Sequence, residues 1–394
     1  MRSKKGKEWE RQMMGGAAAK TASMPPAFLA FTKVWGIAYL ALFFLFVALM
    51  VMADIIPLWM LIMIVAVLGI ASALLFPMLY LKNVKKQRKI VATVIATLLM
   101  FLYIYGAIGF ASIAGFFSAV TGGTDKFAKP VNVLREPFNI YISGLDVSGK
   151  IGKKSRSDVN MIMTVNPKTN KILLTSIPRD MLIKMPDKGG VTDKLTHTGI
   201  YGIGTTLGAV EDLTGVDMNY YVKVNYTTVE KFVDAIGGID VNSNYEFDTH
   251  GMKAHYHFNK GKNHLDGKKA LAFARERKSF PDGDFQRNRN QAKVMQAMLR
   301  KGASSKTILV RYSTILNSCK NYMKLNMSQA EIKRLIKRQI SKGDKWKVKR
   351  QSIKGTPASA ICYSTGNIYV SVVEADPTSL ANCVGRIKKV MGKE

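Results

Sequence analysis

The segment FNIYISGLDVSGKIGKKSRSDVNMIMTVNPKTNKILLTSIPRD, residues 138–180, determines the fold of the larger part of this chain. Its apolar residues Ile140, Ile142 and Leu145 predict a buried strand that ends at Asp146. The β-forming runs VNMIMTV and KILLTS flank the turn formers of residues 166–170, and this pattern predicts a hairpin. A sheet therefore begins in this segment.

Helical and strand patterns alternate after this segment. Residues 194–215 have helical spacing with Gly215 as a stop, and NYYVKVNY, TTVEKFVDAIGG and IDVNSNYEF predict a strand, a helix and a strand. The runs LDGKKALAFARER and NRNQAKVMQAMLRKGAS predict two helices, the second starting near Phe285. The expected fold class is α/β, with a mixed central sheet sandwiched by helices.

The C-terminal quarter continues this alternation. We expect a helix over residues 307–325 and a second helix in SQAEIKRLIKRQI, with Ser328 as the N-cap and Glu331 at N3. At least two strands and a final short helix are expected after it.

Three uncharged runs precede the sheet. Residues 34–52 read VWGIAYLALFFLFVALMVM, which as a helix spans about 28 Å, and residues 55–81 and 90–122 also lack charges. A cleavable signal peptide has a single short apolar stretch, so three consecutive runs predict three transmembrane helices.

Basic residues flank these runs unequally. The first 33 residues and the connection at 82–89 are rich in lysine and arginine, whereas the connection between the first two runs carries only Asp54. Basic flanks stay on the cytoplasmic side. We therefore expect a multi-pass protein of the cell membrane with a cytoplasmic N-terminus and an extracellular domain after residue 122.

The charge balance narrows the partners of that outer domain. The 394-residue chain has a formal net charge of +31, and most of the excess falls after residue 122. A cationic domain at this place faces anionic lipid head groups, lipid-linked phosphates and acidic wall polymers. We expect no nucleic-acid partner, because the topology opposes one and no helix-turn-helix pattern is present.

Acidic and basic residues cluster at the ends of the predicted elements, where α/β sheets usually place their sites. Each cluster alone is typical of a solvated surface. Together they favour a phosphate ester, because arginines donate paired hydrogen bonds to phosphate and carboxylates hold a hard divalent cation. The clusters are Asp146; Arg156 with Asp158; Arg179 with Asp180; and Arg275, Arg277, Asp284, Arg287 and Gln291.

Six pieces of residues 139–301 resemble, in order and spacing, the catalytic domain of the LytR-CpsA-Psr phosphotransferases. These are bacterial envelope enzymes that attach glycopolymers to peptidoglycan, and they also carry an N-terminal membrane anchor. The matching pieces are GLDVSGKIGKKSRSDVNMIMTV, LTSIPRDM, KLTHTGIYG, VDAIGGIDV, LDGKKALAFARER and DGDFQRNRNQ.

The resemblance implies a ligand for each cluster. Asp146 and Asp158 would hold Mg²⁺, with Mn²⁺ as an alternative, against a polyprenyl pyrophosphate that carries the glycopolymer. An apolar cavity would take the polyprenyl tail. The reaction would move a glycosyl phosphate onto a peptidoglycan hydroxyl, with C6 of N-acetylmuramic acid as the expected acceptor. The residues implied to grip the pyrophosphate are Arg156, Arg179, Arg275, Arg277, Arg287 and Gln291.

Asp284 and Arg179 are the residues that we assign to catalysis. Asp284 stands where the family has an acid near the reacting phosphate, and it either accepts the hydroxyl proton or orients Arg287 through an ion pair. Lys194 lies in the family's lysine motif, with no role assigned. An arginine is often found where Asn290 stands here, a departure that could change how the sugar or acceptor is gripped.

Two other functions remain open. A non-catalytic anionic-polymer-binding protein would need only the basic surface, and a hydrolase would use water as the acceptor for the same lipid-linked intermediate. No obligate protein partner is expected. The expected organisation is a basic tail (1–33), a three-helix membrane anchor (34–122), a linker (123–138), the catalytic domain (139–305) and an extension packed on or near it (306–394).

Histidines and cysteines carry weaker signals. His250, His255 and His257 could bind zinc, but a pH-sensitive loop or a simple surface is the favoured interpretation, because no cysteine or acid stands at ligand spacing. Cys362 and Cys383 bracket a predicted strand and are expected to form a disulfide, which would leave Cys319 free.

Overall fold

The computed structural model describes residues 24–121, 126–149, 151, 155–250, 254–304, 311 and 314–393. Most of the predicted basic tail, part of the linker and part of the helix predicted over 307–325 lie outside these residues. The chain divides into two compact units, Met1–Met52 with Leu58–Ile108, and Ala53–Pro57 with Gly109–Glu394.

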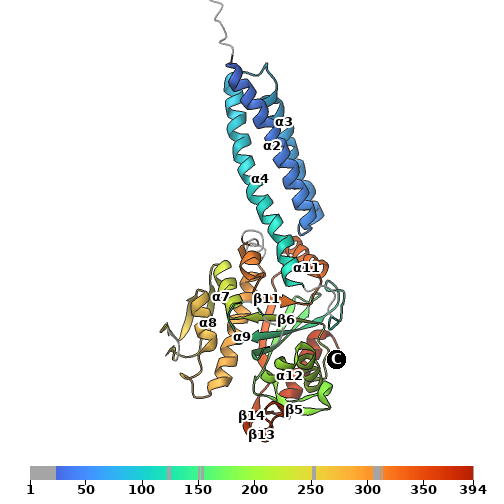
Figure 1. Ribbon diagram of the computed structural model, residues 1–394, viewed down its shortest axis with the longest axis vertical. Helices are drawn as coiled ribbons and strands as arrows, with labels where there is room; N and C mark the ends of the chain where they lie inside the picture. Colours follow the sequence, from blue (N-terminus) through green and yellow to red (C-terminus); the bar gives the residue numbers. More distant parts are fainter. Residues whose placement is uncertain are drawn as a thin grey trace, which may run out of the picture. The chain divides into compact units, whose positions relative to one another are not determined.

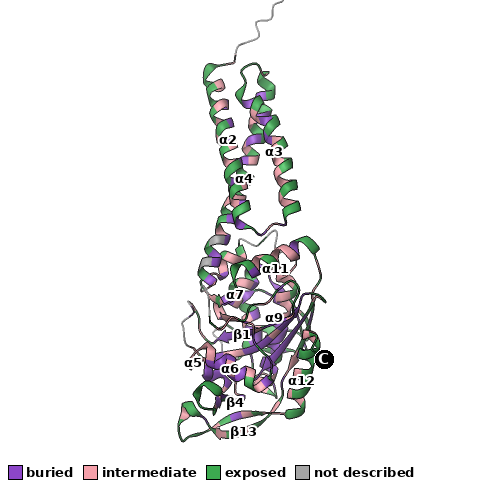
Figure 2. Ribbon diagram, turned by 90° about the vertical axis from the view of Figure 1, so that its right-hand side faces the viewer, coloured by how far each residue is buried: buried purple, intermediate pink, exposed green. Residues whose placement is uncertain are grey.

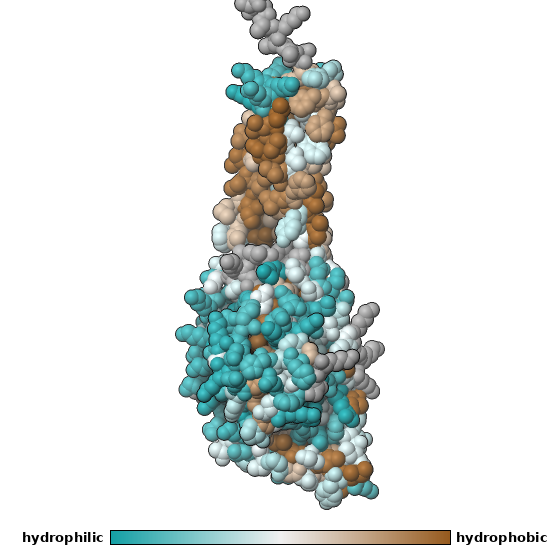
Figure 3. Space-filling view, turned by 90° about the vertical axis from the view of Figure 1, so that its left-hand side faces the viewer, coloured by the Kyte–Doolittle hydropathy of each residue, from teal (hydrophilic) through white to brown (hydrophobic). Residues whose placement is uncertain are grey.

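The first unit is helical. Among the described residues, three helices are long and apolar enough to cross a membrane: α2 (Pro26–Ala53), α3 (Leu58–Tyr80) and α4 (Lys86–Val120), whose last residues belong to the second unit. Hydrophobic residues cover much of these helices in Figure 3, which suits a lipid environment. Each predicted run corresponds to one of these helices, so the three long apolar helices expected from the sequence are present.

The second unit is built on a mixed sheet (Figure 1). β1 pairs antiparallel with β2 and parallel with β6, β2 and β3 form the predicted hairpin, and β12 runs parallel to β3. In spatial order, the strands described in this sheet are β11 (Met323–Leu325), β6 (Tyr220–Asn225), β1 (Phe138–Leu145), β2 (Ser157–Asn166), β3 (Lys171–Ile177) and β12 (Lys347–Ser352).

Helices cover both faces of this sheet, because its strands carry buried side chains toward both sides. Tyr141 packs in one core cluster with residues of α6 and α12, and its neighbour Ile142 packs in another with residues of α9 and α11. Figure 2 shows the resulting buried centre. The helices of these layers are α5 (Leu195–Tyr201), α6 (Ile203–Thr214), α9 (Gly283–Gly302), α11 (Gln329–Lys342) and α12 (Pro377–Met391). The predicted α/β sandwich is confirmed.

A third apolar cluster, which includes Val233, Phe247 and Phe273, joins α7, α8 and one face of α9. The Asn225 side chain caps α7 by accepting a hydrogen bond from the Thr228 amide, and this fixes where strand β6 gives way to the helix. The remaining elements are β4 (Leu182–Met185), β5 (Val191–Lys194), α7 (Tyr226–Ala235), β7 (Ile239–Ser243), β8 (Phe247–Asp248), β9 (His257–Phe258), β10 (Gly261–Leu265), α8 (Gly267–Arg275), β13 (Gly355–Ile361) and β14 (Tyr369–Ala375), with short 3₁₀ turns at Pro186–Lys188 and Tyr363–Thr365.

The C-terminal segment contributes to the sheet itself. The helix predicted over 307–325 is wrong at its end, where β11 pairs with β6 and thereby satisfies its backbone groups. β12 takes the opposite edge, next to β3. Residues 306–394 thus supply both edge strands. The capped helix predicted at Ser328 is confirmed, with reciprocal hydrogen bonds between Ser328 and Glu331.

The expected disulfide is absent. Cys362 and Cys383 are free, buried thiols in the structure. Cys383 lies on α12 in the core cluster that packs on the sheet, and its thiol donates to the Ser352 carbonyl oxygen at 3.6 Å. The Cys383 thiol therefore contacts a backbone carbonyl oxygen and not the Cys362 thiol. Cys319 is also free, as expected.

Candidate active site

The sheet topology brings charged residues to one edge. β1 and β6 are parallel, so Asp146 and Tyr226, which directly follow them, lie at the same edge. Asp158 stands at the start of the antiparallel strand β2, and Arg179 follows the end of β3. Residues at or next to the ends of four strands therefore lie together at one edge of the sheet.

A cavity of about 290 Å³ opens at this edge. Besides the residues at the strand ends, it is lined by Arg275 at the end of α8, by Arg277, and by Arg287 and Gln291 of α9. Seven of the predicted residues therefore meet in one hollow: Asp146, Asp158, Arg179, Arg275, Arg277, Arg287 and Gln291. Arg156 is exposed and does not line this cavity.

Arg179 is the centre of the ion-pair network. Its guanidinium lies 3.0 Å from Asp158, 3.2 Å from Asp180 and 3.6 Å from Asp284. Burial disfavours the charge, but the carboxylates outweigh it and raise the pKa of Arg179 above its ordinary value. Arg179 therefore remains a fixed cation at every physiological pH.

Asp284 links three arginines. Its carboxylate lies 3.2 Å from Arg287, 3.6 Å from Arg179 and 3.7 Å from Arg277. The ion pair to Arg287 is the contact that the orienting role requires. With three guanidiniums around it, this carboxylate is well placed to hold them toward the cavity.

Arg287 has unused donor capacity. Its Nε is buried and has no hydrogen-bond partner among the described residues. Burial, followed by the positive charge of Arg179, lowers the pKa of Arg287. An unsatisfied guanidinium N–H beside a charged cavity is costly unless an anion binds there.

The predicted set omitted four residues that line this cavity: Tyr226, His250, Glu276 and Lys278. The Arg275 guanidinium lies 4.4 Å from the Tyr226 ring centroid, within cation–π distance. Burial, and then a hydrogen bond with Asp146, raise the pKa of Tyr226. Its position after NYYVKVN, at the end of a strand, was the available signal.

Glu276 organises the loop that carries Arg277. It is buried, and its carboxylate accepts backbone N–H bonds from Arg277, Lys278, Ser279 and His250, at 2.7–3.1 Å. Such a cluster of donors stabilises a buried carboxylate. Glu276 therefore shapes the cavity without being a cation-binding group.

The donor set suits Mg²⁺ better than zinc. The carboxylates of Asp146 and Asp158 line one cavity, and Mg²⁺ needs only one or two carboxylates when phosphate and water complete its octahedron. Within the described ranges, no group of three His, Cys, Asp or Glu side chains could hold a metal by itself. His257 instead pairs with Asp248 at 3.0 Å, and His255 faces the Thr249 carbonyl oxygen.

The lysine motif lies beside this network. The Lys194 ammonium is 3.4 Å from Asp180, which in turn contacts Arg179. Its neighbour Asp193 is fully buried and bonds both His197 and Ser364. Lys194 is thus connected to Arg179 through Asp180, and Asp193 is hydrogen-bonded to Ser364 of the C-terminal segment.

An apolar space borders the charged cavity, and a larger apolar cavity borders that space. A narrow space of about 50 Å³ shares Tyr226, Arg275 and Gln291 with the charged cavity. It shares Val224, Met295 and Met298 with an apolar cavity of about 400 Å³ between the sheet and α7, α9 and the end of α4. A charged compartment is therefore bordered by an apolar path.

Known proteins resemble this chain. The LytR_cpsA_psr family model matches residues 118–383. The polyisoprenyl-teichoic acid–peptidoglycan teichoic acid transferase TagU of Bacillus mycoides is 40% identical over 198 residues, covering 50% of this chain and 62% of that protein. TagU of Bacillus subtilis is 35% identical over 261 residues, covering 66% and 79%.

Solved structures agree in fold. B. subtilis TagV has a TM-score of 0.53 at 26% identity, covering 66% of this chain and 99% of that one. A Streptococcus agalactiae protein has a TM-score of 0.55 at 29% identity, covering 66% and 89%. The fold and the site define an α/β protein with three apolar N-terminal helices and a cationic cavity at the edge of its sheet. The chain belongs to the LytR-CpsA-Psr family.

Proposed function

We propose that this protein is a phosphotransferase that moves a glycopolymer, as its glycosyl phosphate, from a polyprenyl-pyrophosphate carrier to peptidoglycan. The observation that carries the proposal is that the cationic cavity and a neighbouring apolar space share the lining residues Tyr226, Arg275 and Gln291. The names of the relatives describe a transfer of this kind, with teichoic acid as the polymer, although the chain spans only 62% of the length of the B. mycoides relative.

The cavities fit an amphiphile with a diphosphate head. Tyr226, Arg275 and Gln291 border both the charged cavity and the narrow apolar space, so a diphosphate bound in the charged cavity would have apolar side chains beside it. The larger cavity is lined by side chains such as Phe117, Met295 and Leu299. Burial of a polyprenyl chain there contributes about 25 cal/mol for each Å² of apolar area removed from water.

The arginines supply the electrostatic part of the reaction. Phosphoryl transfer spreads negative charge over the transferred group and the leaving phosphate, and prearranged cations stabilise that charge. Arg179, Arg275, Arg277 and Arg287 reach the cavity from four different elements and connections, and the Asp284 carboxylate contacts Arg179, Arg277 and Arg287. Arg156 remains a predicted ligand for a part of the substrate outside this cavity.

Asp146 and Asp158 are the residues that would hold Mg²⁺, with Mn²⁺ as the alternative. When bound, the ion would neutralise diphosphate charge. Asp158 also keeps Arg179 in place at 3.0 Å. The carboxylate of Asp158 would therefore connect the metal to the arginine network.

The chemical step forms a bond from the acceptor hydroxyl oxygen to the phosphorus of the glycosyl phosphate. It breaks the bond between that phosphorus and the bridging oxygen, which departs with the polyprenyl phosphate. The hydroxyl proton leaves to solvent in our account, because Asp284 is already engaged by three guanidiniums. Asp284 thus acts by orienting the arginines.

We also propose that the second unit is extracellular. The basic residues before α2 and between α3 and α4 favour the cytoplasm, which leaves the N-terminus inside and residues after α4 outside. Peptidoglycan and the lipid-linked polymer are both met on that side. Labelling of single cysteines added near residue 5 and near residue 212 in intact cells tests this topology.

The test of the proposed function uses the full-length protein in detergent, with Mg²⁺, a lipid-linked glycan donor and peptidoglycan. We expect polymer attached to peptidoglycan through a phosphodiester and released polyprenyl phosphate. Arg275→Gln should lose most of this product, and Arg135→Gln, which removes an exposed charge elsewhere, should not. Free polymer phosphate would indicate a hydrolase, and Mg²⁺-independent retention without product would indicate a binding protein.

A further inference from the structure

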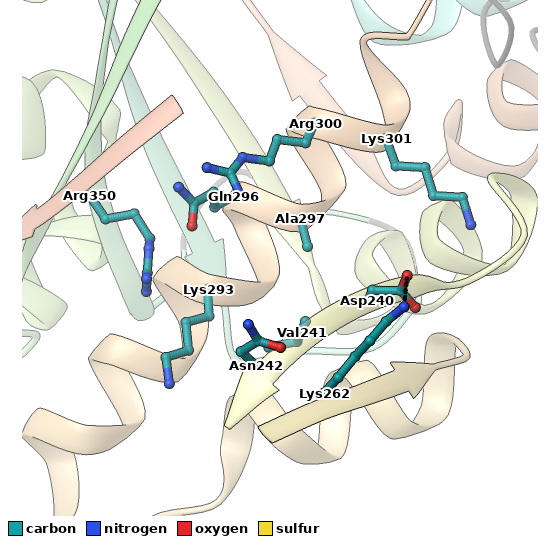
Figure 4. A pocket seen from close by; sticks show the side chains of 10 residues that line it. All are labelled: Asp240, Val241, Asn242, Lys262, Lys293, Gln296, Ala297, Arg300, Lys301 and Arg350. Atoms are coloured by element: carbon teal, nitrogen blue, oxygen red, sulfur yellow. Dashed lines mark ion pairs between the residues drawn. The ribbon is translucent and has the colours of Figure 1, made fainter. Parts of the chain in front are cut away.

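A second basic pocket lies on another side of α9. It has a volume of about 710 Å³ and is lined by residues of α9, β12 and the hairpin of β7 and β10. Figure 4 shows Lys293 and Arg300 from α9 and Arg350 from β12 gathered on one side of it. None of the lining residues belongs to the cavity at the end of the strands.

The positive charge of this pocket is not neutralised within the protein. Asp240 is the acid that lines it, and its carboxylate already contacts Lys262 at 3.3 Å and His264 at 2.7 Å. In the described part of the chain, no carboxylate forms an ion pair with Lys293, Arg300 or Arg350. Clustered cations that have no acidic partner favour binding of an anion.

Lys293 is the most informative of these cations. Only 9% of it is exposed, and its ammonium donates to the Asn244 side-chain oxygen at 3.0 Å. Burial, and then the positive charges of Arg350 and Arg289, lower the pKa of Lys293 to about 8. Burial and two nearby arginines disfavour the charge of this lysine, and a bound anion would offset that cost.

The pocket contains guanidinium groups and side-chain amides as well as lysine ammonium groups. Arg350 can donate two parallel hydrogen bonds to a phosphate group, and Asn242 supplies a further amide donor. Arg300 already donates to the Val348 carbonyl oxygen at 3.3 Å and keeps its other N–H groups for a ligand. Its volume exceeds what a single phosphate fills. These features fit a segment of a chain that carries phosphate groups.

Its place along α9 relates it to the candidate active site. Lys293 follows Arg287 by six residues, which corresponds to about 9 Å along a helix axis. One helix thus presents Arg287 and Gln291 to the charged cavity and Lys293 and Arg300 to the second pocket. A long polymer attached at the first site can extend to the second.

We infer that the pocket formed by Lys293, Arg300 and Arg350 is a subsite for phosphodiester groups of the glycopolymer. The inference rests on the proposed function for the identity of the polymer. It predicts that this protein holds its substrate at two places, one for the diphosphate head and one for the repeating anionic chain.

The test measures binding of a purified poly(glycerol phosphate) oligomer, without lipid or pyrophosphate, to the full-length protein in neutral detergent. The double variant Arg300→Gln/Arg350→Gln is compared with Arg135→Gln/Arg334→Gln, which removes the same charge from exposed positions. We expect the pocket variant to bind the oligomer about tenfold more weakly and the control to bind it within about twofold of wild type. Inorganic phosphate and short-chain phosphatidylglycerol serve as comparison ligands.

Equal losses in the two double variants would overturn the inference, because general surface charge would then account for binding. A loss confined to phosphatidylglycerol would overturn it in favour of a lipid head-group site, and a loss confined to inorganic phosphate would reduce it to a site for free phosphate. The assay contains no donor lipid and no peptidoglycan. The binding result can therefore be interpreted even if the transfer reaction fails. Equally, a negative binding result does not affect the transfer assay.

Discussion

The guanidinium of Arg275 lies over the ring of Tyr226, 4.4 Å from its centroid, at the border between the charged cavity and the apolar path. The contact holds a cation where the diphosphate of the proposed donor would meet its lipid. Replacing Tyr226 by leucine keeps an apolar side chain and removes the π face. We expect the Tyr226→Leu variant to lose about tenfold in kcat/KM, corresponding to about 1.4 kcal/mol. Tyr226→Phe retains the aromatic ring and should lose less kcat/KM. Equal losses in the two variants would show that the hydroxyl, which bonds Asp146, is responsible instead of the ring.

Arg179 is expected to be intolerant even of lysine. One guanidinium contacts Asp158, Asp180 and Asp284, and a lysine ammonium cannot reproduce that planar fork. The Arg179→Lys variant should lose about 100-fold in kcat/KM in the transfer assay. Arg135→Lys serves as the control, and thermal unfolding checks that the variant remains folded. Wild-type turnover in Arg179→Lys would remove this residue from the catalytic set.

The Asp284→Asn variant separates the two roles of this residue. If Asp284 orients Arg179, Arg277 and Arg287, loss of its charge should reduce turnover about tenfold and leave the shape of the pH–rate profile unchanged. A loss of about 1,000-fold together with disappearance of the acid limb of the profile would instead identify a general base.

Much of the second unit follows from local signals in the sequence. The turn formers at 166–170 predicted the hairpin of β2 and β3, and Ser328 with Glu331 predicted the start of α11. Strand β11 was missed, because its three residues become a strand only by pairing with β6, about 100 residues away in the sequence. The expected disulfide was wrong, because the sequence separation of two cysteines does not reveal where their side chains lie in the fold.

The candidate site shows the same division. The charged residues at element ends were predicted as site residues because arginines and carboxylates are typical of phosphate and metal sites. The fold brings seven of the predicted residues to one cavity. Tyr226 and Glu276 were missed. A tyrosine after a strand looks like core, and the role of Glu276 consists of four backbone hydrogen bonds that only the folded loop creates. Neither the second basic pocket nor the apolar path has a contiguous signature in the sequence.

Asp193 is expected to make stability depend on pH. Burial raises the pKa of Asp193, but hydrogen bonds from His197, Ser364 and two backbone amides have the larger effect. The pKa of Asp193 is therefore lowered. A depressed native pKa adds stability above the unfolded value near 3.9, and this contribution disappears as the pH falls through the native value. Asp193→Asn should therefore unfold more easily by about 2 kcal/mol at pH 7.

The measurement is thermal unfolding of the full-length protein between pH 3 and pH 8. The difference between wild type and Asp193→Asn should be largest at neutral pH and shrink below about pH 4. Asp212→Asn alters an exposed carboxylate and should show no such trend. A constant difference over the whole range would rule out the ionised Asp193 as the source of the stability.

In the proposed complex a lipid diphosphate occupies the charged cavity and the apolar path together. Photo-crosslinking with a polyprenyl diphosphate that carries a photoreactive group in its tail measures this occupancy. We expect labelling of the α9 peptide around Met295 and Met298, competition by unlabelled lipid diphosphate, and much weaker labelling of the Arg275→Gln variant. Labelling confined to α2 and α3, unaffected by Arg275→Gln, would contradict it.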